Sequence, residues 1–258
     1  MDWITIGSAT DIGCVKEENQ DYHTWHPQGS DSAGGSGALL ILADGMGGHA
    51  DGAQASRLAA NTLLDIYRRH KSDLVVNTLQ RGFMEANRII FEKSAEMLTA
   101  KGMGTTLVAA FLKGAKMQFA HVGDSRGYLI NSAGITQFTE DHSYIARLVK
   151  AGVIAPEEAV DHPESSVITR AIGLQETVTV DTSQQPLTTK KGDYVLLCCD
   201  GLWGVVPDEE ILTCVRQACE PAAISENLVQ QAIDNGGPDD ITVLTARLNK
   251  TGWISGLF

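Results

Sequence analysis

The chain has 258 residues, 43% of them hydrophobic, and carries a formal net charge of −12. This length and composition suit one folded domain with a sizeable core. The acidic balance leaves no basic surface for a nucleic acid, so we expect neither DNA nor RNA as a partner.

The sequence carries no sign of a membrane segment. No apolar run is long enough to span a bilayer, and Met1–Thr5 lacks the basic and apolar regions of a signal peptide. The five cysteines form no C-x-x-C pair, which favours packing thiols in a reducing compartment. We therefore expect a cytoplasmic monomer without a membrane partner, in which residues 251–258 form a short apolar tail.

Short apolar runs rich in β-branched residues recur along the chain and predict strands. They span residues 3–6, 39–43, 105–112, 117–122, 128–130, 194–199 and 241–248. Gly123–Asp124 and Ser132–Gly134 separate the middle runs as turns, which predicts an antiparallel meander. The Gly/Ser-rich stretch 27–37 is expected to be a loop.

Helical periodicity appears in two blocks, each of which predicts a pair of helices. The apolar faces consist of Ala59, Leu63, Ile66 and Tyr67; Leu79, Phe83, Ala86 and Ile90; Ile211, Val215 and Cys219; and Ile224, Leu228 and Ala232. The helices do not alternate with strands, so a parallel sheet is disfavoured. We predict an α+β fold: a four-layer α-β-β-α sandwich, with two antiparallel sheets flanked by helix pairs.

Residues 142–168 differ from their surroundings. A short helical pattern formed by Ile145, Leu148 and Val149 is followed by Gly152, Pro156 and a polar stretch. We expect a flap-like insertion about 142–168, which lies over the functional site and selects protein substrates.

Aspartates border three of the apolar runs. Asp44 and Asp200 each follow a run, and Asp239 and Asp240 precede the last one. A single Asp-Gly is usually only a turn, but several carboxylates brought together need a cation. Because no cluster of His or Cys accompanies them, these oxygen ligands favour Mg²⁺ or Mn²⁺ over Zn²⁺.

These segments, in this order, resemble the metal-dependent serine/threonine protein phosphatases of the PPM class, or PP2C family, in their bacterial form. The matching segments are Glu18–Asp21, Asp44–His49, Gly102–Thr106, His121–Arg126, Thr139–Ser143, Thr169–Gly173, Cys199–Trp203 and Gly237–Thr242. They cover almost the whole chain, so residues 1–250 are expected to form a single phosphatase domain.

The resemblance implies the α-β-β-α sandwich independently, and it also implies a ligand set. Asp44, Asp200 and Asp239 would hold one metal ion. Asp21, Asp44 and the carbonyl of Gly45 would hold a second, with Asp44 bridging the two. Asp124 and Asp200 would hold a third, weaker ion. The expected cofactors are therefore two Mg²⁺ or Mn²⁺ ions in the active site, with a third at the weaker position.

Two positions depart from the family pattern. The phosphate-binding arginine is replaced by Lys16, which offers a point charge instead of a bidentate fork. Animal members carry a histidine directly after the metal-binding Asp-Gly, whereas this chain has Met46 there and His49 further along. We expect Lys16 and His49 to bind substrate, and His49 to act in catalysis with Asp44, Asp200 and Asp239.

The implied reaction is hydrolysis of phosphoserine and phosphothreonine in proteins by a metal-activated water. The enzyme would oppose a serine/threonine kinase, and its substrates are expected to include that kinase. Two alternatives stay open: a catalytically inactive relative that acts as a regulatory binding module, and a phosphatase of small phosphorylated metabolites.

Overall fold

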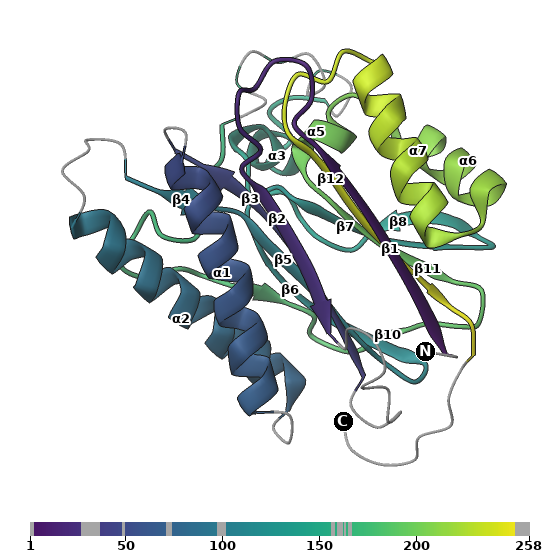
Figure 1. The fold of residues 1–258 in the computed structure, drawn as a ribbon, viewed down its shortest axis with the longest axis horizontal. Coiled ribbons are helices and arrows are strands. Elements are labelled where there is room, and N and C mark those ends of the chain that lie inside the picture. The colour runs from purple at the N-terminus through teal and green to yellow at the C-terminus, as the bar shows by residue number, and fades with distance from the viewer. Residues whose placement is uncertain are drawn as a thin grey trace.

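The protein is built in four layers, with helices outside and two β-sheets inside (Figure 1). The computed structural model describes residues 3–26, 37–47, 50–70, 74–96, 102–155, 158, 162, 164 and 167–250. Both sheets are antiparallel, and a helix pair covers the outer face of each. The predicted α+β sandwich is thus confirmed.

The first sheet joins the two ends of the described chain and has the strand order β1-β12-β11-β7-β8. Its strands are β1 (Ile4–Asp11), β12 (Ile241–Leu248), β11 (Tyr194–Cys198), β7 (Arg126–Asn131) and β8 (Gly134–Gln137). Ile4 pairs with Leu248 at one end of the β1–β12 ladder, and Asp11 pairs with Ile241 at the other. The start of β12 therefore lies beside the end of β1.

The second sheet has the order β10-β6-β5-β3-β2. Its strands are β10 (Leu187–Thr188), β6 (Lys116–Val122), β5 (Leu107–Lys113), β3 (Ala38–Met46) and β2 (Asp21–His26), with β4 (Gly104–Thr105) on β3 and β9 (Asp181–Thr182) on β6. The sequence DYHTWH of β2 has no apolar run, and this strand was not predicted. It pairs along β3 and places Asp21 opposite Asp44.

An apolar core between the sheets fixes their relative position. Alternate residues of β3 point to opposite faces. Leu40 and Leu42 join the core between the sheets, whereas Leu39 and Ile41 join the core under the helices. Because β3 is buried on both faces, its sequence is apolar without alternation, as expected for a central strand.

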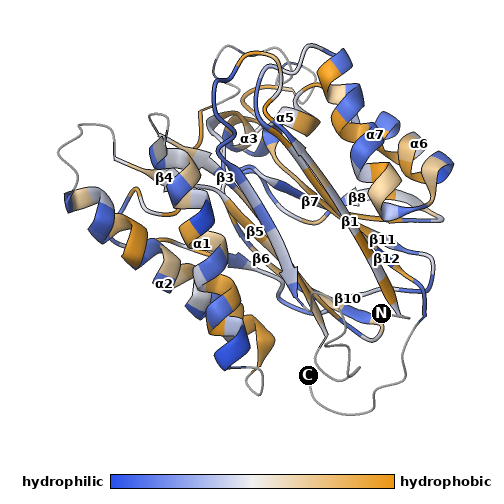
Figure 2. Cartoon of the chain, viewed as in Figure 1, coloured by the Kyte–Doolittle hydropathy of each residue, from blue (hydrophilic) through white to orange (hydrophobic). Residues whose placement is uncertain are grey.

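The four long helices carry both hydrophobic and hydrophilic residues, and the strands between them differ, with β2 largely hydrophilic (Figure 2). α1 (Ala50–Arg69) and α2 (Val75–Glu96) pack on the second sheet, and α6 (Asp208–Ala218) and α7 (Pro221–Asp234) pack on the first. Two short helices, α3 (Tyr144–Lys150) and α5 (Asp200–Trp203), lie near one edge of the sheets. A Cβ at Gly7 would overlap the backbone of Ala222, so this glycine allows α7 to approach β1 closely.

The predicted meander is wrong at one turn. The hairpin at Ser132–Gly134 forms between β7 and β8, but Gly123–Asp124 does not connect paired strands. β6 belongs to the second sheet and β7 to the first, so the chain crosses from one sheet to the other at this turn. The crossing brings Asp124 to the boundary between the two sheets.

Cys219 was also predicted wrongly. It was expected on the buried face of α6, but the helix ends at Ala218 and Cys219 is exposed, with φ = 60°. A left-handed residue ends the helical periodicity, so the spacing from Val215 no longer sets its direction.

Several predictions fall outside the described residues: the loop 27–36, His49, the tail 251–258 and part of the insertion 142–168. No helix in the described part of the chain is long and apolar enough to cross a membrane.

Candidate metal centre

The predicted aspartates reach one edge of the sandwich from both sheets. Asp21 and Asp44 face each other across β2 and β3 of the second sheet. Asp200 begins α5 directly after β11, and Asp239 precedes β12 of the first sheet. Because β11 and β12 are antiparallel neighbours, the end of one strand and the start of the other lie side by side.

The carboxylates are close enough to disfavour one another's charge. Burial raises the pKa of Asp44 well above its ordinary value, and the charges of Asp21, Asp200, Asp124 and Asp239 add to the effect. The four partners come from separate parts of the chain. One cluster of negative charge therefore forms where the two sheets meet.

The pKa values of two further aspartates of the cluster are raised as well. Burial raises the pKa of Asp21 to about 7, with repulsion from Asp240 and Asp200. It raises the pKa of Asp200 to about 6, with repulsion from Asp239. Within the described part of the chain, both buried oxygens of Asp21 lack a hydrogen-bond partner. An unsatisfied buried carboxylate is costly, so this cluster suits a cation.

Gly45 brings the backbone close to the cluster. A Cβ at this position would overlap the carbonyl oxygen of Gly52 and come 2.6 Å from that of Gln20. Only glycine fits between these two segments. The predicted carbonyl ligand therefore lies on β3, one residue after Asp44.

The position of Asp44 is set by two threonines that the sequence analysis did not single out as site residues. The amide of Asp44 donates to the Thr106 hydroxyl at 3.0 Å, and the Thr105 hydroxyl donates to the Asp44 carbonyl at 2.8 Å. The amide of Thr106 donates to the same carbonyl at 2.8 Å. Both threonines are fully buried, so the backbone beneath the carboxylate is held rigidly.

Asp240 is a second supporting residue. Its carboxylate accepts a hydrogen bond from the amide of Gln20 at 2.8 Å, and its side chain is buried. Gln20 precedes Asp21, so the start of β12 holds the start of β2 across the two sheets. The sequence placed Asp240 beside the centre but gave no signal for this contact.

Lys16 lies beside the cluster, and its ammonium group is 2.7 Å from Asp239 Oδ1. Burial opposes its charge, but the hydrogen bond and the charge of Asp239 outweigh that effect and raise the pKa of Lys16. Its side chain is 42% exposed, so the ammonium group can also reach a ligand from solvent.

Asp124 faces the same space from the crossing between the sheets. Burial raises its pKa to about 7, with repulsion from Asp200 and Asp141, and its buried Oδ1 has no hydrogen-bond partner among the described residues. The Trp203 indole donates to the Asp124 carbonyl at 3.0 Å. Asp124, Asp200 and Asp239 all line one open cavity of about 860 Å³.

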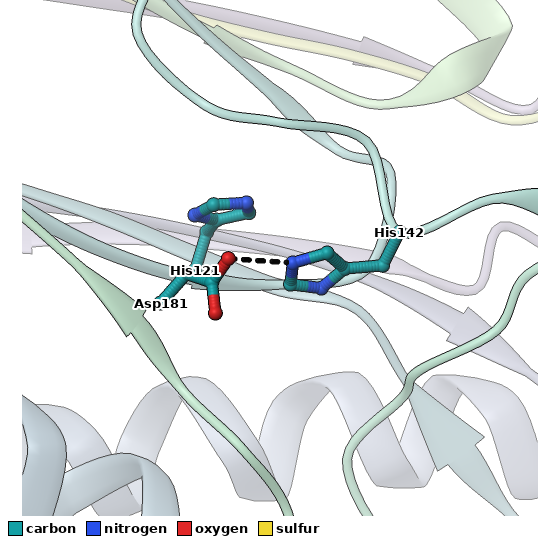
Figure 3. A group of neighbouring side chains, drawn as sticks. All are labelled: His121, His142 and Asp181. Atoms are coloured by element: carbon teal, nitrogen blue, oxygen red, sulfur yellow. Dashed lines mark hydrogen bonds and ion pairs between the residues drawn. The ribbon is translucent and has the colours of Figure 1, made fainter. Parts of the chain in front are cut away.

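A separate cluster contains His121, His142 and Asp181, whose ligand atoms lie within 4.8 Å of one another (Figure 3). The two imidazole rings are stacked, with centroids 4.6 Å apart and planes 21° from parallel. The in-plane lone pairs of nearly parallel rings do not converge on one ion. Arg170 already supplies positive charge here, 2.9 Å from Asp181 Oδ1.

The hydrogen bonds of His142 explain this cluster without a metal. Its Nδ1 accepts from the Gly123 amide at 3.0 Å, so Nε2 carries the proton and donates to Asp181 Oδ2 at 3.2 Å. Burial lowers the pKa of His142 to about 4, with a further contribution from His121, so the ring is neutral at physiological pH. The cluster is therefore an internal hydrogen-bond network.

Comparisons with known proteins agree with the fold and with the family that the motifs resemble. The model of the family described as Protein phosphatase 2C matches residues 8–241. The serine/threonine phosphatase stp of Listeria monocytogenes serotype 4b (strain F2365) is 39% identical over 220 residues, covering 83% of this chain and 85% of the relative.

Solved structures agree as well. The S. agalactiae serine/threonine phosphatase superposes with a TM-score of 0.87 and 33% identity, over 96% of this chain and 100% of that one. The catalytic domain of the phosphatase PstP, in complex with two manganese ions, gives a TM-score of 0.81 and 33% identity. The match covers 96% of this chain and 99% of that one. Fold and sequence thus define a metal-dependent serine/threonine protein phosphatase. The chain belongs to the protein phosphatase 2C family, as its motifs predicted.

The carboxylate cluster predicts an unusual effect of Asp44→Asn on stability without metal. The folded-state pKa of Asp44 is raised, so its charge destabilises the native protein as pH rises from about 4. In a chelator at pH 8, Asp44→Asn should unfold at higher urea than the unmodified protein. At pH 4 both side chains are neutral, and the difference should nearly disappear.

The control is Asp65→Asn on the exposed face of α1, which should have almost no effect at either pH. If Asp44→Asn were less stable than the unmodified protein at pH 8, the carboxylates would not repel one another as described.

Proposed function

We propose that Asp21, Asp44, the Gly45 carbonyl, Asp200 and Asp239 hold two divalent ions, Mg²⁺ or Mn²⁺, at which phosphoserine and phosphothreonine of proteins are hydrolysed. Asp44 would serve as a ligand of both ions, and Asp124 and Asp200 would hold a third ion more weakly. The observation that supports this assignment most directly is the burial of mutually repelling carboxylates at one edge, with unpaired oxygens on Asp21 and Asp124.

The donor set favours this class of ion. Carboxylate and carbonyl oxygens are hard ligands, which Mg²⁺ and Mn²⁺ accept together with water. The cysteine beside the cluster, Cys199, is unsuitable as a ligand because burial raises its pKa, and its thiol donates to the Asp240 carbonyl at 3.2 Å. This thiol acts in packing, and the ligands are oxygens.

The proposed reaction transfers a phosphoryl group from a seryl or threonyl oxygen to water. The bond between phosphorus and the side-chain oxygen breaks, a bond to the water oxygen forms, and the side-chain oxygen gains a proton. Divalent ions at the carboxylates would supply Lewis acidity, which lowers the pKa of a water and neutralises phosphoryl oxygens. His49 as the proton donor stays a prediction, since it lies outside the described residues.

Lys16 is suited to bind the phosphoryl group. Its ammonium group is held at the edge of the cluster by Asp239, with which it pairs at 2.7 Å. A cation held by Asp239 would compete with Lys16 for that carboxylate, and Lys16 could then bind the phosphoryl oxygens of the substrate. A lysine makes this contact as a point charge, without the bidentate geometry of arginine.

The wider role follows from the resemblance to bacterial relatives. We propose a cytoplasmic enzyme in which residues 1–250 form one domain and which opposes a serine/threonine kinase that is itself among the substrates. Turnover of phosphopeptides against nucleotides and sugar phosphates tests the substrate class. Faster turnover of nucleotides or sugar phosphates would favour the metabolite phosphatase instead.

Loss of a proposed ligand should remove turnover. Asp200→Asn and Asp239→Asn should each lower kcat/KM at least about 100-fold, since even a residue that merely supports a metal ligand costs 10- to 100-fold. The measurement is Mn²⁺-dependent turnover of a phosphopeptide, together with Mn²⁺ binding by calorimetry. The exposed Asp65→Asn is the matched control. A folded Asp200→Asn protein with near-normal turnover would contradict the ligand assignment.

Lys16→Ala should act mainly on substrate binding. We expect KM for a phosphopeptide to rise about tenfold with a smaller fall in kcat, because a half-exposed charged contact is lost. Lys16→Arg should keep KM at or below the original value. Lys191→Ala removes an exposed lysine that precedes β11, at the end of the strand away from Asp200. This control should change neither KM nor kcat. An unchanged KM in Lys16→Ala would show that the phosphoryl group takes its positive charge from elsewhere.

A further inference from the structure

The cavity over the carboxylates continues beyond them, between α3 and α5. This second part, which we call the α3 groove, is lined by Ile145, Ala146, Val149, Trp203, Val205 and Pro238. The whole cavity, of about 860 Å³, lies in the size range of ligand pockets. The proposed reaction at the carboxylates uses none of these side chains.

Charged residues also line the α3 groove, but they are paired with one another. Lys150 binds Glu140 at 2.6 Å, and Arg126 binds Asp141 at 2.7 Å. These pairs leave the apolar side chains as the contact surface for a ligand. A ligand with a charged side chain would have to displace one of these pairs, whereas an apolar side chain would not.

The apolar surface of the groove is held in place before any ligand arrives. The Trp203 indole donates to the Asp124 carbonyl at 3.0 Å, and the Arg126 guanidinium lies 3.8 Å from its ring centroid. On the opposite wall, the Ser143 hydroxyl caps α3 by accepting from the Ala146 amide at 3.1 Å. A rigid apolar surface costs little ordering on binding.

The groove is continuous with the centre, because Asp124, Asp200 and Asp239 line the same cavity. Trp203, which lines the groove, is hydrogen-bonded to the Asp124 carbonyl at 3.0 Å. A peptide whose phosphoryl group lies at these carboxylates therefore has the neighbours of its phosphorylated residue beside the groove. A free metabolite phosphate would leave this surface uncovered.

We propose that the α3 groove is the subsite for an apolar side chain next to the phosphorylated residue of a protein substrate. This inference rests on the proposed function, since the phosphoryl group must lie at the carboxylates. It makes α3, the described helix of the insertion, a wall of the substrate site.

The test uses phosphopeptides that differ only by leucine or serine at one position, from two residues before to two after the phosphoserine. At one of these positions, leucine should raise kcat/KM about tenfold, the lower range for apolar groups in a pocket. Val149→Asp should reduce that ratio to near one, while turnover of a small aryl phosphate stays within about twofold. Val149→Ala should reduce the leucine-to-serine ratio of kcat/KM partly. It replaces Val149→Asp in the test if the aspartate variant does not fold.

The matched control is Val153→Asp, the same substitution on the same insertion but outside the groove, where the side chain is 66% exposed. It should keep the leucine preference. Equal kcat/KM for all peptide pairs would overturn the proposal, as would equal losses on peptides and aryl phosphate in folded Val149→Asp. Failure of the proposed function would look different: either no phosphorylated compound would be turned over, or nucleotides and sugar phosphates would be turned over faster than every phosphopeptide.

A second inference comes from the network of His142. His142 forms two hydrogen bonds with Gly123. Its amide donates to the Gly123 carbonyl and its Nδ1 accepts from the Gly123 amide, both at 3.0 Å. Gly123 has φ = 108°, and a Cβ there would lie 2.6 Å from Thr106, so the turn is tightly constrained. The next residue is Asp124.

The geometry points to His142 as a positioning residue for Asp124, with Asp181 fixing the tautomer. Asp181 accepts a hydrogen bond from Nε2–H, and the unprotonated Nδ1 accepts from the Gly123 amide. Arg170 holds Asp181 in turn at 2.9 Å. This inference rests on the proposal that Asp124 is a metal ligand.

His142→Ala should raise the Mn²⁺ concentration for half-maximal turnover about 3- to 10-fold, the effect of one lost hydrogen bond. His142→Asn should show a smaller rise than His142→Ala, because the asparagine amide oxygen can accept the Gly123 hydrogen bond in place of Nδ1. Tm and the folded fraction are measured for both. Asp124→Asn should show the same shift, which tests the assignment of Asp124 separately. An unchanged half-maximal Mn²⁺ concentration in folded His142→Ala, or no difference between Ala and Asn, would overturn the inference.

Discussion

The mutual repulsion of carboxylates is the constraint on which the rest of this structure depends. Burial disfavours the charge of Asp21, Asp44, Asp124 and Asp200, and the charge of at least one neighbouring aspartate disfavours each of them further. Such a cluster would separate on flexible loops. Here the carboxylates are held by strand ends and by buried hydrogen bonds, so the fold keeps them together for a cation.

The supporting contacts come from residues that were not predicted as site residues, two of which, Asp240 and Trp203, lie in the same motifs as the charges. Thr105 and Thr106 fix the backbone of Asp44, Asp240 fixes that of Gln20, and Trp203 and His142 fix the crossing that carries Asp124. Each contact is a hydrogen bond to main-chain atoms. The positions of the carboxylates therefore depend on backbone geometry more than on side-chain packing.

The sequence predicted the elements whose pattern is local. Continuous apolar runs marked β3, β11 and β12, and the aspartates at their ends followed directly. β2 was missed because an edge strand with half-buried polar residues shows no apolar run. The crossing at Gly123–Asp124 was taken for a hairpin, because a turn sequence does not reveal which sheet receives the next strand.

The contacts of His142 could not be predicted at all from the sequence. They join residues 19 and 39 positions apart through the tertiary fold. The motif resemblance supplied the proposed ligand set. The supporting residues lie in the matching segments too, but the resemblance gave them no role in holding the ligands. Site chemistry is thus readable from short segments, whereas site geometry depends on the pairing of distant ones.

Each sheet contributes its own share of the carboxylates: Asp21 and Asp44 come from one, Asp200 and Asp239 from the other. Any shear of one sheet over the other changes the spacing between these two pairs. The apolar layer that resists such sliding, which includes Leu40, Leu197 and Leu244, therefore acts as a spacer for the active site. A ligand bound by both pairs would link the two sheets directly. The rigidity of the whole sandwich and the spacing of the carboxylates are therefore one mechanical property.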